Sequence, residues 1–319
     1  MIDFQKAKGL GMGCWQLAGP SSFGGRVNGY GAISKEIALE TVQTAYDSGI
    51  RFFDTADAYG HGKSERYLAE GLNENSENVL ICSKIGGREN ESGEAFQDFS
   101  AEYTYQAVEA SLERLNRDYL DILLLHNPPD DTDWSGFDKS ALDDLKKQGK
   151  IRAYGVSCRS VYGAQSVVEA GFGDFVELIF NPLDRRAEDL VFPIAEEKGI
   201  QIIARVPLAS GFLTDKILKA DPQFDLDDIR STFPEDMTEW MLESARKLNF
   251  LSGNGGGLAS SSLRFSLFHP AVFAVIPGMR NPDQVRRNVA VREMGPLDEA
   301  QIEQIKEAVP VVFHKWLPK

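Results

Sequence analysis

Four residues with ionisable or phenolic side chains stand at or just after the ends of short apolar runs in the chain. Asp54 and Tyr59 lie in FFDTADAYG, Lys84 follows the run LICS, and His126 ends DILLLH. Side chains of these types donate and accept protons, as a general acid or base must. Each one taken singly is more typical of a solvated loop or of packing. Four of them after successive apolar runs indicate a common site.

The elements that would position these residues alternate along the chain as short apolar runs and amphipathic segments of helical length. Most runs are continuous, as expected for parallel strands buried on both faces. The predicted strands are Met12–Leu17, Arg51–Asp54, Val79–Ser83, Leu120–Leu125, Ile151–Ser157, Phe175–Phe180, Gln201–Val206 and Val272–Ile276. The predicted helices are a segment from the Ser34 cap to Gly49, then Ala101–Leu115, Lys139–Gln148, Val161–Ala170, Ala187–Lys198 and Leu258–Phe268.

Eight strands separated by helices favour an α/β fold of the (β/α)8 TIM barrel type, with residues 1–319 forming one domain. A closed parallel barrel would gather the four residues at its C-terminal rim. The alternation alone leaves a doubly wound sheet open, but the G-x-G-x-x-G fingerprint of that fold is absent. Gly253–Gly257 is read as a flexible turn. Two insertions, Pro20–Gly31 and Ala220–Thr238, are expected over the rim.

The bulk composition excludes several classes of function. The formal charge of −14 is spread along the chain, which disfavours binding to nucleic acid or to anionic membranes. The apolar stretches are of strand length, and the N-terminal residues do not form a signal peptide, so we expect a cytoplasmic protein. The cysteines, Cys14, Cys82 and Cys158, have no paired spacing, and the sequence predicts no disulfide framework and no metal site.

Several segments resemble the successive motifs of the aldo-keto reductase family. They are GMGCWQL, FFDTADAYG with GKSERYLAEGL, SKIG, DILLLHNPP, IRAYGVS, ARVPLASGFLTDK and VIPGMRNPDQVRRN. The similarity runs from about Gly9 to Asn288 in the family's order and spacing, and the combination is highly specific. The resemblance implies an NADPH-dependent reductase of aldehydes or ketones built on a (β/α)8 barrel.

By this resemblance, Asp54, Tyr59, Lys84 and His126 form the catalytic tetrad. A free tyrosine has a pKa near 10 and is a weak acid at neutral pH. The Lys84 ammonium is expected to favour the phenolate, and Asp54 to hold Lys84 charged and oriented. Tyr59 would then act as the general acid of carbonyl reduction, or as the general base of the reverse reaction. His126 would donate a hydrogen bond to the carbonyl oxygen.

The resemblance also implies a set of residues around an extended NADP(H). Cys14, Trp15 and Asp54 would lie beside the cofactor, and Ser157 would meet the nicotinamide carboxamide. The residues implied at the pyrophosphate and adenosine ends are Pro207, Leu208, Ser210, Gly211, Lys216, Gly278, Arg280, Gln284 and Asn288. A lysine and an arginine near the 2′-position favour NADP(H) over NAD(H), because guanidinium pairs well with phosphate. Arg286 and Arg287 either join this positive patch or form an exposed helix face.

Three positions depart from the commoner family pattern. Cys158 stands where asparagine is usual, Glu177 where a glutamine often binds the carboxamide, and Arg205 where an aromatic residue often stacks on the nicotinamide. Glu177 can accept from the carboxamide amine but adds negative charge near the ring, and the Arg205 guanidinium can stack. Cys158 is a packing residue, a donor to the cofactor or a site of oxidation. These differences leave the reaction class standing and put the affinity for the cofactor and the preference for NADP(H) in question.

Three other functions remain open at this stage. The same residues serve NAD(P)+-dependent oxidation of an alcohol or sugar, and a catalytically weak NADP(H)-binding regulatory subunit would keep them too. A barrel isomerase or aldolase with Lys84 as a Schiff base does not explain Tyr59 and His126 together. The substrate, a small-molecule carbonyl or alcohol, is expected to meet the two insertions and the C-terminal segment ending in Trp316. The aromatic residues Trp15, Phe23, Tyr30 and Trp316 either line that pocket or belong to the core.

Overall fold

The computed structural model describes residues 3–220, 222–253 and 255–311 of the chain. Its central feature is a closed barrel of parallel strands. The barrel strands are β1 (Gly9–Leu10), β2 (Met12–Gly13), β5 (Phe52–Asp54), β6 (Leu80–Ile85), β9 (Leu120–His126), β10 (Ile151–Ser157), β11 (Phe175–Ile179), β12 (Gln201–Arg205) and β13 (Val272–Ile276). Their order around the sheet is β1-β13-β12-β11-β10-β9-β6-β5-β2. This confirms the predicted α/β parallel barrel.

The barrel closes through its N-terminal segment, because β1 pairs with β13 while β2 pairs with β5. Only Gly11 separates β1 from β2, and its N–H donates to the Val275 carbonyl at 2.8 Å. A Cβ on Gly13 would lie 2.9 Å from the Ile276 oxygen, so this approach needs glycine. Together, β1 and β2 occupy the position of the first of eight strands around the barrel within the described residues.

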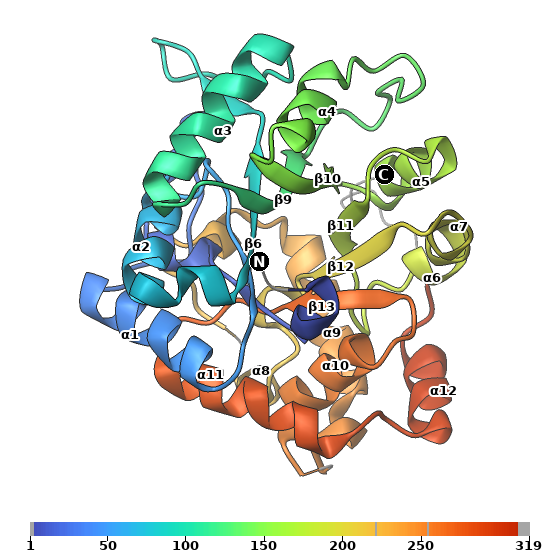
Figure 1. The fold of residues 1–319 in the computed structure, drawn as a ribbon. Helices are drawn as coiled ribbons and strands as arrows, with labels where there is room; N and C mark the ends of the chain where they lie inside the picture. Colours follow the sequence, from blue (N-terminus) through green and yellow to red (C-terminus); the bar gives the residue numbers. More distant parts are fainter. Residues whose placement is uncertain (1–2, 221, 254, 312–319) are drawn as a thin grey trace.

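Helices form a ring outside the strands (Figure 1). They are α1 (Lys35–Asp47), α2 (Lys63–Leu72), α3 (Ala101–Leu115), α4 (Ser140–Lys147), α5 (Val161–Ala170), α6 (Ala187–Leu190), α7 (Phe192–Lys198), α8 (Asp215–Lys219), α9 (Glu235–Lys247), α10 (Gly257–Leu267), α11 (Pro282–Val289) and α12 (Glu299–Ala308). The Ser34 side chain accepts from the Ile37 N–H and caps α1, as its position in the sequence indicates. Two hairpins, β3 (Ser22–Phe23) with β4 (Arg26–Val27) and β7 (Gly87–Glu89) with β8 (Ala95–Gln97), rise from the loops.

Two predicted elements differ most from the structure in their extent. The strand expected over Met12–Leu17 ends at Gly13, and Trp15–Ala18 forms the 3-10 helix η2, which packs on α2 and buries Leu17. The helix expected over Ala187–Lys198 is two helices that meet at Val191. Pro193 explains this break, because it lacks the N–H that a continuous helix needs at that position. Helices α2, α8, α9, α11 and α12 were not predicted; α9 begins inside the insertion Ala220–Thr238.

The barrel interior is filled with side chains at its N-terminal end. Phe52, Leu124 and Phe273 belong to the interior cluster, and the 3-10 helix η1 (Phe4–Ala7) plugs the N-terminal end. The Phe4 ring lies 5.6 Å from that of Phe175. A larger apolar cluster fills the layer between strands and helices. With its N-terminal end blocked, the barrel leaves the C-terminal rim for chemistry.

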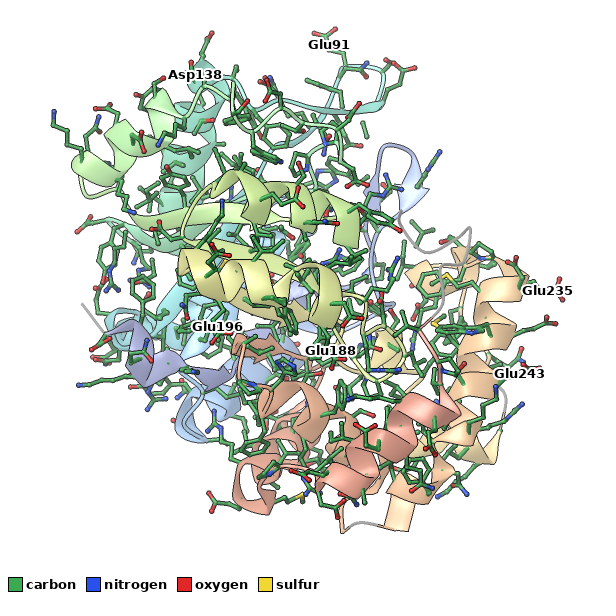
Figure 2. All side chains as sticks on the ribbon, turned by 90° about the vertical axis from the view of Figure 1, so that its right-hand side faces the viewer. Glu91, Asp138, Glu188, Glu196, Glu235 and Glu243 are labelled. Atoms are coloured by element: carbon green, nitrogen blue, oxygen red, sulfur yellow. The ribbon has the colours of Figure 1, made fainter. Side chains whose placement is uncertain are left out.

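Acidic side chains are distributed over the outside of the molecule. Glu91 and Asp138 are exposed on two different loops, and Glu235 and Glu243 are exposed on α9, as Figure 2 shows. This agrees with a net charge that is spread along the chain. Among the described residues, no helix combines the length and the apolar character needed to cross a membrane.

Candidate active site

Three of the four candidate catalytic residues lie at the C-terminal ends of adjacent barrel strands. Asp54 is the last residue of β5, Lys84 lies in β6, and His126 is the last residue of β9. β6 runs two residues beyond the predicted Val79–Ser83, so Lys84 is a strand residue rather than the one that follows the strand. Its side chain is fully buried. The parallel register therefore brings these side chains to one level of the rim.

Lys84 is the centre of a buried hydrogen-bonded cluster. Its Nζ lies 2.6 Å from both Asp54 carboxylate oxygens and donates to the Thr55 carbonyl at 3.0 Å. The same Nζ lies 3.5 Å from the Tyr59 hydroxyl and 3.3 Å from a Glu177 carboxylate oxygen. Burial by itself lowers the pKa of Lys84, but the Asp54 and Glu177 carboxylates raise it well above its usual value. Lys84 is therefore an ammonium at neutral pH.

The Tyr59 ring is fixed between two other rings. It stands in the turn before α2, where its N–H donates to the Ala56 carbonyl at 3.2 Å. The Trp15 ring stacks on it with centroids 5.5 Å apart, and His126 lies edge-on with centroids 5.7 Å apart. The hydroxyl is thereby held against Lys84 with little rotational freedom.

Burial controls the ionisation of both rings. It raises the pKa of Tyr59, and although Lys84 lowers that pKa in turn, burial is the larger effect. The expectation that Lys84 would make Tyr59 more acidic is therefore outweighed in this state of the protein, and Tyr59 holds its proton at neutral pH. Burial, followed by the charges of Lys84 and Arg205, lowers the pKa of His126 well below its usual value. His126 is a neutral imidazole with one N–H to donate.

Ser157, Glu177 and His126 lie side by side because of the strand register. Ser157 is the Cα partner of His126 on one side and of Glu177 on the other. The Ser157 hydroxyl donates to Glu177 Oε1 at 2.9 Å. Sequence reasoning treated Glu177 only as a contact to the cofactor. Its contact with Lys84 depends on register and could not be read from the motifs.

Asp54, Cys82 and Glu177 have carboxylate and thiol atoms within 4.8 Å of one another. Such a group has the composition of a metal site. Here the Lys84 ammonium contacts both carboxylates and supplies the positive charge between them. Burial also raises the pKa of the Cys82 thiol well above its usual value, which disfavours the thiolate that a metal requires.

The loop that follows β12 has an unusual backbone. Val206, Ala209 and Ser210 have φ values of 55°, 44° and 55°, in the left-handed region that non-glycine residues rarely adopt. Backbone strain of this kind is common where a loop is shaped for a ligand. Among the other residues predicted here, Pro207 is buried, Leu208 and Gly211 are partly exposed, and Lys216 is exposed on α8.

The residues predicted at the adenosine end lie after β13 and on α11. The Arg280 N–H donates to Gln284 Oε1 at 2.7 Å, and Arg280 Nη2 donates to the Ala32 carbonyl at 2.7 Å. Asn288 is buried on α11, while Arg286 is exposed and pairs with Asp283 at 2.9 Å. Arg286 and the exposed Arg287 thus form a helix face.

Gly278 and the two residues that follow β2 line the rim beside this segment. A Cβ on Gly278 would lie 2.0 Å from the Gln16 amide nitrogen, so a glycine at this position allows Gln16 to approach the backbone closely. Cys14 is buried, and its N–H donates to the Asp54 carbonyl at 2.8 Å. Trp15 donates to the Asn28 carbonyl at 3.3 Å. Cys14 and Trp15 therefore adjoin both the cluster around Lys84 and the first insertion.

The two insertions meet across the rim. Tyr30 forms an antiparallel bridge with Asp228, and the Ile229 N–H donates to the Gly29 carbonyl at 2.7 Å. Arg230 pairs with Asp228 and donates to the Ser210 carbonyl at 3.3 Å, which joins the second insertion to the strained loop. Sequence reasoning missed Arg230 because its contact with Ser210 joins two separate loops. Tyr30 also packs edge-on to Trp15, with centroids 5.0 Å apart.

Phe23 and Trp316 are the other two aromatic residues predicted to line the pocket or to belong to the core. Phe23 is in the β3–β4 hairpin, where its ring lies 6.3 Å from that of His61. Trp316 lies outside the described residues.

Asp57, in the turn that carries Tyr59, provides a test of the local electrostatics. Burial, and then the nearby Glu65, raise its pKa from about 4 to about 7. The folded state then binds more protons than the unfolded state between these values, so the free energy of unfolding falls as pH rises from about 4 to about 7. We expect Asp57→Asn to flatten this fall and to gain up to about 3–4 kcal/mol relative to the wild type at pH 8. Urea unfolding at pH 5 and pH 8 measures both quantities.

The exposed Asp118 offers the matched control, since Asp118→Asn removes the same charge without a buried environment. It should change the free energy of unfolding by less than about 0.5 kcal/mol. A pH dependence in Asp57→Asn equal to that of the wild type would contradict the assignment.

Comparison with known proteins agrees with this geometry. The sequence profile described as "Aldo/keto reductase family" matches residues 9–310. The oxidoreductase YqkF of Bacillus subtilis (strain 168), itself uncharacterized, is 30% identical over 301 residues, covering 93% of this chain and 91% of that protein. L-galactose dehydrogenase of Arabidopsis thaliana is 29% identical, covering 90% and 89%. The holo form of the aldo-keto reductase AKR11C1 from Bacillus halodurans superposes with a TM-score of 0.77 at 25% identity, covering 97% and 95%.

An aldo-keto reductase from Klebsiella pneumoniae with the same fold, 20% identical to this chain, has been solved in complex with NADPH. A relative from Escherichia coli (strain K12), 26% identical over 295 residues, is named an NADH-specific methylglyoxal reductase. The family match spans the barrel strands and every candidate catalytic residue. This chain belongs to the aldo/keto reductase family and is an NAD(P)H-dependent oxidoreductase that acts on carbonyl substrates.

Proposed function

We propose that the protein reduces an aldehyde or ketone, either a small carbonyl compound or an aldose, to the alcohol with NADPH, and that Tyr59 is the general acid. The observation that carries this proposal is the position of the Tyr59 hydroxyl, 3.5 Å from the buried Lys84 ammonium and beside the His126 ring. A carbonyl oxygen that approaches this hydroxyl meets a proton donor and a neutral hydrogen-bond donor together.

The protonation states of the side chains in the cluster suit carbonyl reduction. Tyr59 retains its proton because burial raises its pKa, and it gives up that proton only when the carbonyl oxygen gains negative charge. The phenolate that remains is stabilised by Lys84, whose charge is held by Asp54 at 2.6 Å. His126 orients the carbonyl oxygen through its N–H. In the opposite direction the same groups remove a proton from an alcohol.

The dinucleotide, when bound, supplies the hydride. The polar atoms near the cluster fit a nicotinamide carboxamide, which has an N–H donor and a carbonyl acceptor. Within the described part of the chain, Glu177 Oε2 is a buried acceptor 3.3 Å from the Lys84 ammonium, and Arg205 Nε is a buried donor 3.9 Å from Glu177 Oε1. Each atom thus lies near an opposite charge, but neither makes a hydrogen bond. Ser157 lies between them and His126 in the strand register. Buried polar atoms left in this way favour a ligand that satisfies both.

Arg280 is the residue we assign to the 2′-phosphate, and the assignment predicts a change in cofactor preference. Its guanidinium is anchored on the Ala32 carbonyl by Nη2, and its backbone N–H is held by Gln284. Arg280→Ala should weaken NADPH binding by about 10–100-fold, the effect of losing a charged hydrogen bond, and weaken NADH binding far less. Fluorescence titration with each reduced cofactor gives the two dissociation constants.

Arg286→Ala is the matched control for Arg280→Ala. Arg286 carries the same charge on α11 but is exposed and paired with Asp283. Its replacement should leave the ratio of the two dissociation constants unchanged. Equal weakening of NADPH and NADH in Arg280→Ala would remove Arg280 from the 2′-phosphate site.

A second direction, NADP+-dependent oxidation of an alcohol or sugar, is favoured by one observation. The relative from Arabidopsis thaliana is named a dehydrogenase of L-galactose. The experiment that tests both directions follows the absorbance of the reduced nicotinamide with a panel of aldehydes, ketones and aldoses, and then NADP+ with the matching alcohols. Turnover that is confined to one direction at neutral pH identifies the working reaction. Tight NADPH binding without turnover in either direction would instead support a regulatory subunit.

A further inference from the structure

The three positions that depart from the commoner family pattern contact one another in the fold. The Cys158 N–H donates to the Glu177 carbonyl at 2.8 Å, and Arg205 Nη2 donates to the Cys158 carbonyl at 2.9 Å. Arg205 Nε lies 3.9 Å from Glu177 Oε1. Residues far apart in the sequence therefore meet at one place, and two of them, Glu177 and Arg205, carry opposite charges.

Glu177 and Arg205 are fixed in different ways. The Glu177 side chain is 1% exposed and is held by the Ser157 hydroxyl and by the Lys84 ammonium. The Arg205 side chain is 22% exposed at the end of β12, and its guanidinium is tied to the backbone of Cys158. Each side chain keeps one buried polar atom without a hydrogen-bond partner in the described residues. Both charged groups are thus held in place, and each keeps one polar atom with no hydrogen bond to the protein.

The position of the nicotinamide follows from the hydride transfer itself. A carbonyl oxygen at Tyr59 and His126 sets its carbon a bond length away, and reacting carbons must approach to about 3–3.5 Å. Lys84 Nζ lies 3.5 Å from the Tyr59 hydroxyl and 3.3 Å from Glu177, so the ring must bind beside this cluster. This step rests on the proposed function.

We propose that Glu177 and Arg205 act as a charge-compensated pair that sets the preference of the site between oxidised and reduced nicotinamide. The oxidised ring carries a positive charge and the reduced ring is neutral. A carboxylate beside the ring therefore stabilises the oxidised form, and a guanidinium destabilises it. With both present, the two effects oppose each other. Loss of either side chain alone unbalances the site, in opposite directions.

The test is a double-mutant cycle on binding rather than on turnover. Dissociation constants for NADP+ and NADPH are measured by titration in the wild type, Glu177→Gln, Arg205→Gln and the double variant. We expect Glu177→Gln to raise the ratio of the NADP+ constant to the NADPH constant about tenfold, and Arg205→Gln to lower it about tenfold. The double variant should return to within about threefold of the wild type.

Two controls separate this effect from a general disturbance of the site. Adenosine 2′,5′-bisphosphate lacks the nicotinamide, so its dissociation constant should be the same in all four proteins. Glu109→Gln removes a carboxylate from the surface, where Glu109 pairs with Lys150 at 3.1 Å, and should leave the ratio unchanged. Thermal unfolding shows whether each variant is folded, and if Glu177→Gln is not, Arg205→Gln still tests the sign.

The outcomes distinguish this inference from the proposed function. Ratios that are unchanged, or that shift in the same direction in both single variants, would overturn the charge-compensated pair and leave the reductase assignment standing. Failure of the wild type to bind either form of the dinucleotide, NAD(H) included, would overturn the proposed function itself.

Discussion

Tyr59→Phe is expected to bind NADPH as tightly as the wild type while its kcat falls by about 10²–10⁴-fold, the range for loss of a general acid. The replacement removes one oxygen and keeps the ring that stacks on Trp15 and packs edge-on to His126. The carbonyl oxygen then gains charge with no proton donor at the position 3.5 Å from Lys84. Single-turnover measurement with bound NADPH isolates the chemical step from product release.

Tyr119→Phe is the matched control for this experiment. The Tyr119 hydroxyl donates to Glu77 at 2.9 Å just before β9 begins, at the opposite end of that strand from His126. Its loss should leave kcat within a factor of about two, because one hydrogen bond at a partly exposed site contributes little. Turnover in Tyr59→Phe comparable with that in Tyr119→Phe would remove the acid role from Tyr59.

Lys84→Met is expected to damage both stability and catalysis. The variant leaves Asp54 and Glu177 as buried carboxylates without the ammonium that contacts them at 2.6 and 3.3 Å. Removing one partner of a buried ion pair costs about 3–5 kcal/mol. It also removes the charge that stabilises the Tyr59 phenolate, so kcat should fall by at least about 100-fold.

The loss of stability in Lys84→Met should depend on pH, with a sign that the structure fixes. Burial and Glu177 already raise the pKa of Asp54, and without Lys84 that pKa rises further. Folding then favours the protonated carboxyl, so the variant comes closest to the wild type near pH 4 and loses stability as pH rises toward 8. Urea unfolding at several pH values measures this.

Lys150→Met is the control, because Lys150 forms an ion pair with Glu109 on the surface, where such a pair contributes at most about 1 kcal/mol. A Lys84→Met protein as stable as Lys150→Met at pH 8 would contradict the central place of Lys84 in the cluster.

The sequence was sufficient to predict the barrel because most apolar runs are continuous and most are followed by a helical pattern. Helix α3 (Ala101–Leu115) and strand β10 (Ile151–Ser157) match their predicted bounds. The extent of the first barrel strand could not be predicted correctly. Local apolar character continues to Leu17, but the close contacts of Gly13 with β13 and the packing of η2 on α2 end the strand there.

The same limit applies to the site. Motif positions placed Asp54, Lys84 and His126 at one rim, since all three stand at strand ends. The contact of Glu177 with Lys84 depends on the register of β11 against β10, and the higher pKa of Tyr59 depends on burial. The Arg230 bridge to Ser210 joins two loops whose approach no local pattern encodes. The sequence therefore identified the candidate residues but not the contacts that link them.

The measurement that tests the central claim most directly is a fluorescence titration of the purified protein with NADPH and then with NADH. The geometry of Arg280, Glu177 and the loop after β12 predicts saturable quenching at one site per chain, with NADPH bound more tightly. Failure of both cofactors to quench would contradict a dinucleotide site at this rim, and with it the role of Tyr59 in carbonyl reduction.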